Sequence, residues 1–374
     1  MNEFKSRVYT NRPDYADLDS PSKFQAIQGI IATRLRQHPS AICSYSGGAD
    51  SDILIDIIER TRKMFSDGCL PAVKYVFFNT GLEMKATKDH VKATAEKYGV
   101  EIEEIRPKIG IVKAVKNYGV PFYSKLFSQR LYEYQKKQIP LSIISEFHNA
   151  TDKQKKFYEI NERYPKCRTL IRFLLCVDKN GTKKNGQLSI SSVPFFADFL
   201  NDSPPSFTIS AKCCDYCKKQ AAHQVQKDYD MIITGEREAE GGVRSVSKSI
   251  LKNNSTNTMC FAEKSNGQYR FRPLYYVSDK DKAWYKEHYG IRYSDAYEVY
   301  GLKRTGCCGC PINSKAVDDL KKIRPYEPNV VKAAWNIFGD SYCYRQKYNE
   351  YKAKRREEEK RNKDQITFEE GGNL

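Results

Sequence analysis

The chain has 374 residues and a formal net charge of +17, from 63 Lys and Arg against 46 Asp and Glu. This length can hold one large α/β domain with a smaller appended region, and the lack of a visible internal repeat excludes a repeat architecture. Because the 12 cysteines stand in a chain without an apolar N-terminal segment, we expect a cytoplasmic protein with neither a disulfide framework nor a membrane span.

The excess of positive charge predicts a polyanionic partner. Lys and Arg that contact phosphates gain from counterion release, and the 26 tyrosines can stack on unpaired bases. We therefore expect nucleic acid as a partner, and charge alone does not distinguish DNA from RNA. Attraction of a small anionic ligand, or solubility alone, would also account for this charge.

Segments with strand and helix patterns alternate along the chain. A polar arm over residues 1–22 precedes a helix over 24–35. The next expected elements are strand 41–45, helix 51–65, strand 73–79, helix 85–98 ending before Gly99, strand 101–105 and, later, a buried strand over 230–234. This order predicts an α/β fold with a mostly parallel, doubly wound sheet and a ligand at the carboxyl ends of its strands.

Two regions differ from this pattern. Residues 126–205 form a predicted helical insertion, rich in Lys, Gln, Tyr and Phe, that either recognises substrate or builds a homodimer interface. Residues 345–364 are nearly all charged and predict a solvated terminal helix. The expected organisation is an arm over 1–22, a nucleotide-binding domain over 23–258 with the insertion, a cysteine-rich region over 259–330 and a charged helical tail over 331–374.

A glycine-rich string connects the first expected strand to its helix. It reads Ser46-Gly47-Gly48-Ala49-Asp50-Ser51. Adjacent glycines let the backbone turn tightly around an anion, and the N–H groups at the helix start point partial positive charge at it. The two serines add hydroxyl donors, and Asp50 can cap the helix or orient a metal-bound phosphate. The string therefore predicts a nucleotide phosphate site.

The string resembles the signature of the PP-loop ATP pyrophosphatases, which have an adenine nucleotide alpha-hydrolase-like fold. Asn79-Thr80-Gly81-Leu82-Glu83 is similar to the Asp-Thr-Gly-x-Glu segment of the phosphoadenylylsulfate (PAPS) reductase family, with Asn at position 79 where Asp is usual. A third motif is similar to that family's Gly-x-Arg-x-x-Glu-Ser-x-x-Arg, with Gly241 in place of Ser; its matching residues are Gly235, Arg237, Glu240 and Arg244. The resemblance covers roughly residues 38–315 and implies that these motifs contact the nucleotide.

Cysteines are grouped at two distant places. The groups are Cys213-Cys214-x-x-Cys217 and Cys307-Cys308-x-Cys310, with a single Cys260 between them. Thiolates at this spacing can converge on one metal centre, but spacing alone does not separate zinc from an iron–sulfur cluster. Four further cysteines stand in apolar or isolated positions, and we expect them to be ordinary core thiols: Cys43, Cys69, Cys167 and Cys176.

The family resemblance favours a [4Fe-4S] cluster. Lys212-Cys213-Cys214 is similar to a segment of the cluster-bearing members, in which a distant CxxC completes the ligand set. It implies Cys214, Cys260, Cys307 and Cys310 as ligands, with Cys213 as the substitute for Cys260. Zinc and metal-free buried thiols remain the alternatives.

These motifs together predict an ATP-dependent sulfur transferase. In this interpretation ATP binds with Mg²⁺, Asp50 and Arg237 act on its phosphates, the target oxygen of DNA or tRNA is adenylated, and pyrophosphate leaves. The incoming sulfur, from a donor such as a cysteine desulfurase, would be delivered by a free iron site of the cluster or by a persulfide on Cys217 or Cys308. A PAPS or adenylylsulfate reductase is the first alternative, although no Glu-Cys-Gly-x-His tail follows Cys343. A non-catalytic regulator that binds nucleotide or nucleic acid is the second.

Overall fold

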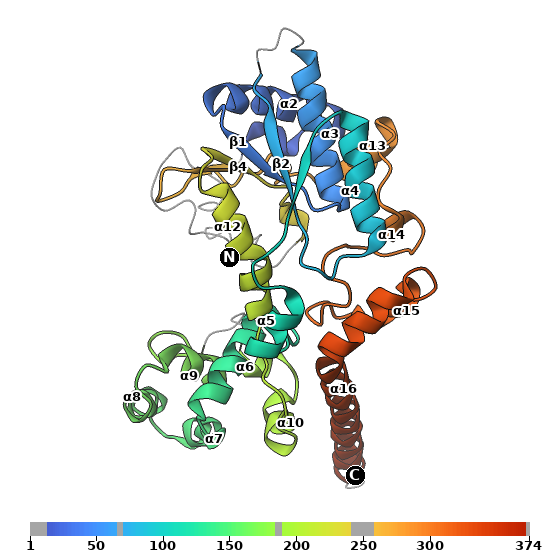
Figure 1. The fold of residues 1–374 in the computed structure, drawn as a ribbon. Helices are drawn as coiled ribbons and strands as arrows, with labels where there is room; N and C mark the ends of the chain where they lie inside the picture. The colour runs from blue at the N-terminus through green and yellow to red at the C-terminus, as the bar shows by residue number, and fades with distance from the viewer. Residues whose placement is uncertain (1–12, 66–69, 184–188, 241–257, 372–374) are drawn as a thin grey trace. The chain divides into compact units, whose positions relative to one another are not determined.

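The computed structural model describes residues 13–65, 70–183, 189–240 and 258–371 (Figure 1). The chain divides into two compact units. Unit 1 comprises Met1–Gly110, Cys217–Cys308 and Lys321–Val330, and unit 2 comprises Ile111–Tyr216, Gly309–Leu320 and Val331–Leu374. Among the described residues, no helix has the length and apolar character needed to cross a membrane.

Unit 1 is built on a six-stranded sheet in the order β3-β2-β1-β4-β6-β5. All neighbouring strands pair in parallel except β5 and β6, which are antiparallel. The strands are β1 (Ala41–Ser44), β2 (Val73–Phe78), β3 (Ile102–Ile105), β4 (Met231–Ile233), β5 (Phe261–Glu263) and β6 (Tyr269–Phe271). The predicted α/β fold with a mostly parallel sheet is therefore confirmed, and each strand expected from the sequence is present.

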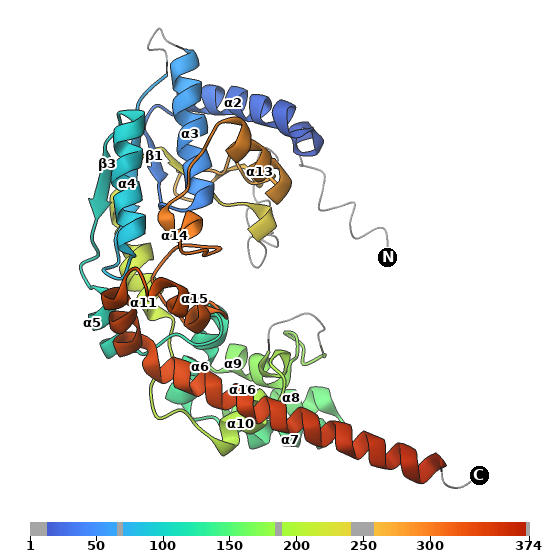
Figure 2. The same ribbon diagram turned by 90° about the vertical axis from the view of Figure 1, so that its right-hand side faces the viewer.

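Successive residues of a strand point to opposite faces of the sheet, and apolar side chains on both faces of this sheet are buried. On one face Cys43, Tyr75 and Ile233 belong to the main hydrophobic core, together with residues of the helices α2 (Ser20–Gln37), α3 (Ala49–Met64) and α13 (Asp279–His288). On the other face Ile42 and Ile232 form a smaller cluster with Val76 and with Val225 of α12 (Gln220–Gln226). In both views α3 runs alongside α4 (Lys85–Tyr98) (Figures 1 and 2).

Three helices of unit 1 were expected from the sequence, at 24–35, 51–65 and 85–98, and all three are present, the first of them beginning at Ser20 within the predicted arm; the other helices were not predicted. The helices of this unit are α2 (Ser20–Gln37), α3 (Ala49–Met64), α4 (Lys85–Tyr98), α12 (Gln220–Gln226), α13 (Asp279–His288) and α14 (Asp295–Glu298), with short 3₁₀ turns at Asp14–Asp17 and Glu238–Glu240. Helix α4 ends at Gly99, whose φ of 64° is the left-handed conformation that glycine adopts at little cost.

Unit 2 contains the predicted insertion, which is helical. Its helices are α5 (Ile111–Tyr118), α6 (Lys125–Lys137), α7 (Ser142–Asn149), α8 (Lys153–Arg163), α9 (Arg168–Leu175), α10 (Phe196–Asp202) and α11 (Lys212–Cys214), with a 3₁₀ turn at Ile190–Ser192. A π-helical turn at Asp215–Lys219 links α11 to α12. Two later helices are α15 (Ala316–Ile323) and α16 (Pro328–Gly371).

The charged C-terminal stretch is helical, as predicted, but its beginning is not solvated. Tyr344 and Tyr348 of α16 are buried in the core of unit 2, where Tyr348 packs at 5.4 Å from the ring of Phe196. Farther along α16, the described side chains from 353 to 362 are exposed. The turn of α16 that carries Tyr344 and Tyr348 is therefore held against the core of unit 2 by burial of these two rings. The charged composition of this stretch alone predicts a fully solvated helix.

Candidate nucleotide-binding site

The glycine-rich loop lies between the carboxyl end of β1 and the start of α3, as expected. Gly47 has φ of 65°, and a Cβ at this position would lie 2.8 Å from Cγ2 of Thr87. The position therefore excludes larger residues both by backbone conformation and by space. The hydroxyl of Ser51 accepts from the N–H of Gly48 at 3.0 Å and donates to the carbonyl of Gly48 at 2.7 Å. It also lies 3.0 Å from the hydroxyl of Ser46, so Ser51 holds the loop in shape.

The Gly235 motif packs directly against this loop. A Cβ at Gly235 would lie 3.3 Å from the carbonyl oxygen of Asp50, so any larger residue would make a tight contact with the loop. Two residues later, Arg237 donates from Nε to Oδ1 of Asp50 at 2.9 Å. The N–H of Arg237 donates to Oε2 of Glu240 at 3.2 Å. The structure thus brings together the two motifs that the sequence connected only through a family resemblance.

Arg237 is almost fully enclosed, with 4% of its surface exposed. Its other nitrogens donate to the carbonyl of Val277 at 3.0 Å and to Oδ1 of Asp279 at 2.9 Å. Burial acts against the charge, but the carboxylates of Asp50 and Asp279 outweigh it and raise the pKa of Arg237. Arg244, the other arginine predicted here, lies outside the described residues, as does Gly241.

Several basic and hydroxyl side chains at this site were not predicted. Lys282 of α13 places Nζ 2.7 Å from Oδ1 of Asp50, which therefore faces two cations at once. The hydroxyl of Tyr297, from α14, accepts a hydrogen bond from the N–H of Ala49 at 3.4 Å. Because these residues come from segments without a local motif, the sequence carried no signal that they join the loop.

Together these elements enclose a cavity of about 550 Å³. Its walls combine the loop, the Gly235 motif, α13, α14 and the segment that leads to Cys307. The lining residues are Ser44, Ser46, Gly48, Ala49, Asp50, Ser51, Gly235, Glu236, Arg237, Glu240, Asp279, Lys282, Tyr297, Lys303, Arg304 and Thr305. Four basic side chains and the N-terminus of α3 suit a polyphosphate, and the carboxylates suit a magnesium ion bound to it.

The Asn79-Thr80-Gly81 motif forms a turn after β2 that its own side chains stabilise. Asn79 accepts from the N–H of Gly81 at 2.9 Å and donates to Oε1 of Glu104 at 3.2 Å. Thr80 donates to Oε1 of Glu83 at 3.0 Å. All of these residues are described, and Asn79, Thr80 and Gly81 are not part of the cavity lining. Their predicted contact with nucleotide stays a prediction.

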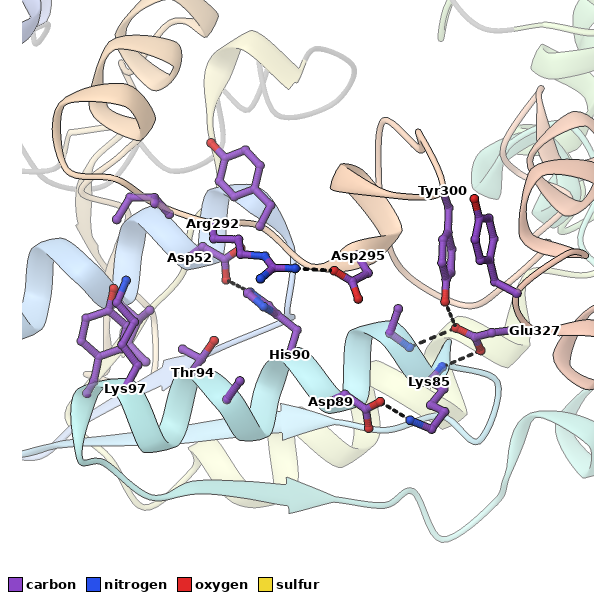
Figure 3. Close-up of a pocket in the computed structure, with 17 residues that line it drawn as sticks. Asp52, Lys85, Asp89, His90, Thr94, Lys97, Arg292, Asp295, Tyr300 and Glu327 are labelled. Carbon is purple, nitrogen blue, oxygen red and sulfur yellow. Dashed lines mark hydrogen bonds and ion pairs between the residues drawn. The ribbon is translucent and has the colours of Figure 1, made fainter.

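A buried hydrogen-bond network braces the loop from behind. The hydroxyl of Tyr45 donates to Oδ1 of Asp52 at 2.5 Å, so the residues just before and just after the loop are tied together. His90 places Nε2 2.9 Å from the same oxygen (Figure 3). Burial, reinforced by the charge of Asp52, raises the pKa of Tyr45, which keeps its proton as the donor. Asp52 and His90 also line a second cavity of about 490 Å³.

The predicted metal-binding cysteines have different surroundings. Cys260 is buried in the core of unit 1, where Sγ lies 2.7 Å from the hydroxyl of Tyr15. Cys307 instead lies 3.4 Å from Oγ1 of Thr80, just after β2. The assignment of Cys260 and Cys307 to one metal centre stays a prediction.

The two predicted sulfur carriers are buried. Cys217 donates from Sγ to the carbonyl of Ile109 at 3.3 Å, and Cys308 donates its N–H to the carbonyl of Leu82 at 2.8 Å. In unit 2, Cys213 is buried, and Cys214 and Cys310 are partly exposed. Cys43 and Cys167 are buried as expected for core thiols, Cys176 is half-buried, and Cys69 lies outside the described residues.

Within the described ranges, no group of three or more His, Cys, Asp or Glu side chains is arranged to hold a metal ion. The cysteine ligand set therefore stays a prediction from the sequence motifs.

The fold and the loop define an α/β protein with a basic cavity beside a glycine-rich loop at the carboxyl end of its sheet. Residues 40–151 match the family model described as phosphoadenosine phosphosulfate reductase domain. This match confirms, for that part of the chain, the family resemblance that the motifs predicted. No curated protein matches the chain significantly.

Three solved structures are similar to the chain at low identity. PAPS reductase from Candida auris, in a phosphate complex, is 12% identical, with coverage of 82% of this chain and 95% of that one and a TM-score of 0.37. The U34-tRNA thiolase NcsA from Methanococcus maripaludis, with its [4Fe-4S] cluster, is 12% identical, with coverage of 86% and 78% and a TM-score of 0.32. NH3-dependent NAD synthetase from Campylobacter jejuni is 11% identical, with coverage of 87% and 96% and a TM-score of 0.30.

Proposed function

We propose that this cavity binds ATP with Mg²⁺ and that the chain adenylates an oxygen of a nucleic acid, as the first half of an ATP-dependent sulfur transfer. The observation that carries the proposal is the loop at the start of α3 facing Arg237 and Lys282, both of which pair with Asp50. A polyphosphate entering this cavity would meet backbone N–H groups and four basic side chains in one place.

Asp50 supports this function through an exchange of partners. Its Oδ1 lies within 2.9 Å of Arg237 Nε and 2.7 Å of Lys282 Nζ, so it balances two cations while no nucleotide is bound. A bound polyphosphate would take over both cations as the stronger anion. The carboxylate would then be free to hold a magnesium ion on the phosphates.

The adenylation half of the proposed reaction needs only ATP and the target oxygen. A target oxygen attacks the α phosphorus, the bond between this phosphorus and the bridging oxygen breaks, and pyrophosphate leaves with the electron pair. Arg237, Lys282 and the start of α3 stabilise the charge that develops on pyrophosphate. In the second half, the terminal sulfur of a persulfide, from a donor such as a cysteine desulfurase, displaces AMP, which leaves with the former target oxygen. A thiol reductant then supplies two electrons to cleave the S–S bond, so that sulfur remains in place of oxygen.

The test is pyrophosphate release from ATP by anaerobically purified protein, with tRNA, with DNA and without nucleic acid. Stimulation by one polymer would support the proposal and identify the substrate class. ATP binding without pyrophosphate release under all three conditions would instead support a non-catalytic regulator.

A sulfonucleotide reductase is the second candidate, and the match of residues 40–151 to the PAPS reductase domain model favours it specifically. In that case the same basic cavity would hold the phosphates of PAPS or adenylylsulfate. A parallel assay for sulfite from these substrates separates the two functions, because a reductase would form sulfite without consuming ATP.

We also propose a [4Fe-4S] cluster, on the ground of the sequence resemblance, with Cys214, Cys260, Cys307 and Cys310 as ligands and Cys213 as the substitute for Cys260. No step described above depends on it. Anaerobic absorption spectra with iron and zinc analysis would test this assignment, with Cys310→Ser as the variant expected to lose a brown chromophore. A colourless wild-type protein rich in zinc would overturn it in favour of a zinc site.

A further inference from the structure

One short segment of unit 1 reaches from the nucleotide cavity to the turn after β2. We call residues 303–308 the strap. Lys303, Arg304 and Thr305, at its start, line the cavity. Oγ1 of Thr305 lies 3.4 Å from the hydroxyl of Tyr297, and only 3.0 Å would separate it from a Cβ at Gly48. This end of the strap therefore rests against the phosphate loop.

The other end of the strap is fixed to the turn after β2. Sγ of Cys307 lies 3.4 Å from Oγ1 of Thr80, and Cys308 donates its N–H to the carbonyl of Leu82 at 2.8 Å. Only Gly306 separates Thr305 from Cys307, so their Cα atoms lie at most about 7 Å apart. A displacement at Thr305 is therefore either absorbed by Gly306 or passed on to Cys307.

Tyr297 connects the strap to the helix start. Its hydroxyl accepts from the N–H of Ala49, the first residue of α3, and lies next to Thr305. The N–H groups at a helix start are the ones that bind phosphate oxygens. The hydroxyl of Tyr297 thus stands where a phosphate oxygen would bind. Burial raises the pKa of Tyr297, so the hydroxyl keeps its proton and can donate to a phosphate.

We propose that Tyr297 and Thr305 contact the phosphates of the bound nucleotide, and that the strap couples occupancy of the phosphate loop to the position of Cys307. This inference rests on the proposed binding of ATP. A phosphate oxygen that takes over the N–H of Ala49 displaces the Tyr297 hydroxyl, and Thr305 follows because its own hydroxyl lies 3.4 Å from that of Tyr297. The coupling is reciprocal. If nucleotide binding shifts the equilibrium between two positions of Cys307 by some factor, then fixing Cys307 in one of these positions changes nucleotide affinity by the same factor.

A double-mutant cycle tests this coupling. The probe is an ATP analogue with a methylene bridge between the α and β phosphorus atoms, and the readout is its dissociation constant by calorimetry. We expect Tyr297→Phe to weaken binding on the order of fivefold, since it removes one hydrogen bond to phosphate. Cys307→Ala should weaken binding on the order of threefold, and the double variant should be no weaker than Tyr297→Phe alone.

The matched control replaces the exposed thiol of α16. As a single substitution, Cys343→Ala should leave the affinity for the ATP analogue unchanged. Combined with Tyr297→Phe, it should not weaken binding further. If the double variant weakens binding by the product of the two single factors, the two sites are independent and the proposed coupling is wrong, whereas the proposed binding of ATP is unaffected. If the wild-type protein does not bind the analogue, the proposed function falls and this inference falls with it. Should Cys307→Ala not fold, Cys307→Ser takes its place in the same cycle with the same criteria.

Discussion

At the scale of single residues, the site is organised around the carboxylate of Asp50. Arg237 is too enclosed for water to solvate its charge, and a buried guanidinium without a charged partner would destabilise the fold. Asp50 supplies the partner, and Lys282 joins from α13. The two cations are therefore held in place in the free protein, and the proposed nucleotide would need little reorganisation of them on binding.

Replacing Asp50 tests this arrangement. We expect Asp50→Ala to lower pyrophosphate release by at least about 100-fold, because the carboxylate available to magnesium is lost and Arg237 is no longer oriented. The protein should remain folded, and any cluster chromophore should remain. Asp89→Ala is the control, because Asp89 forms an exposed pair with Lys85 and does not line this cavity, and it should change the rate by less than about threefold. Loss of fold and chromophore together in Asp50→Ala would show that Asp50 is structural.

A second carboxylate of α13 makes stability depend on pH. Asp281 accepts from Lys23 and from Ser20, both at 2.7 Å. Burial acts to raise its pKa, but these donors and Ser278 outweigh burial and lower the pKa of Asp281 from 3.8 to about 2. Because the unfolded chain takes up this proton more readily, the stabilisation is complete above about pH 4 and is lost as the pH falls to about 2.

Thermal unfolding across this pH range tests the assignment. Asp281→Asn should lower the Tm by about 2–4 °C near neutral pH and should flatten the acid side of the stability profile between about pH 4 and pH 2. Asp295→Asn is the control, since Asp295 forms an exposed pair with Arg292 and should leave the profile unchanged. An unchanged acid limb in Asp281→Asn would contradict the lowered pKa.

At the scale of elements, the start of α3 depends on the conformation of Gly47. Alanine there would need a left-handed backbone, and its Cβ would lie 2.8 Å from Thr87. We expect Gly47→Ala to destabilise the protein by about 1–3 kcal/mol and to abolish nucleotide binding. Gly29→Ala is the matched control: this position in α2 has nothing within 4 Å, and alanine there should stabilise the helix by about 0.5–1 kcal/mol. Equal effects of both variants on stability, measured by denaturant unfolding, would contradict this explanation.

The elements were predictable wherever the signal is local. The apolar strands, the stop at Gly99 and the glycine loop each depend on neighbouring residues, and each is where the sequence placed it. Lys282 and Tyr297 were missed because they reach the loop through tertiary packing of α13 and α14, which leaves no pattern in the chain. For the same reason the sequence could not show that Cys260, despite its suitable spacing, lies in the core beside Tyr15.

At the scale of the whole molecule, the net charge of +17 makes a prediction that is independent of any one residue. If nucleic acid is the substrate, its phosphates release counterions on binding, so affinity must fall steeply with salt. We expect tRNA or DNA affinity, measured by fluorescence anisotropy, to drop at least about 100-fold between about 50 and 200 mM salt. Binding that is insensitive to salt would contradict a polyanion partner. Equal affinity for both polymers would assign the charge to non-specific attraction, and discrimination between them would then have to arise where the reacting nucleotide meets the cavity.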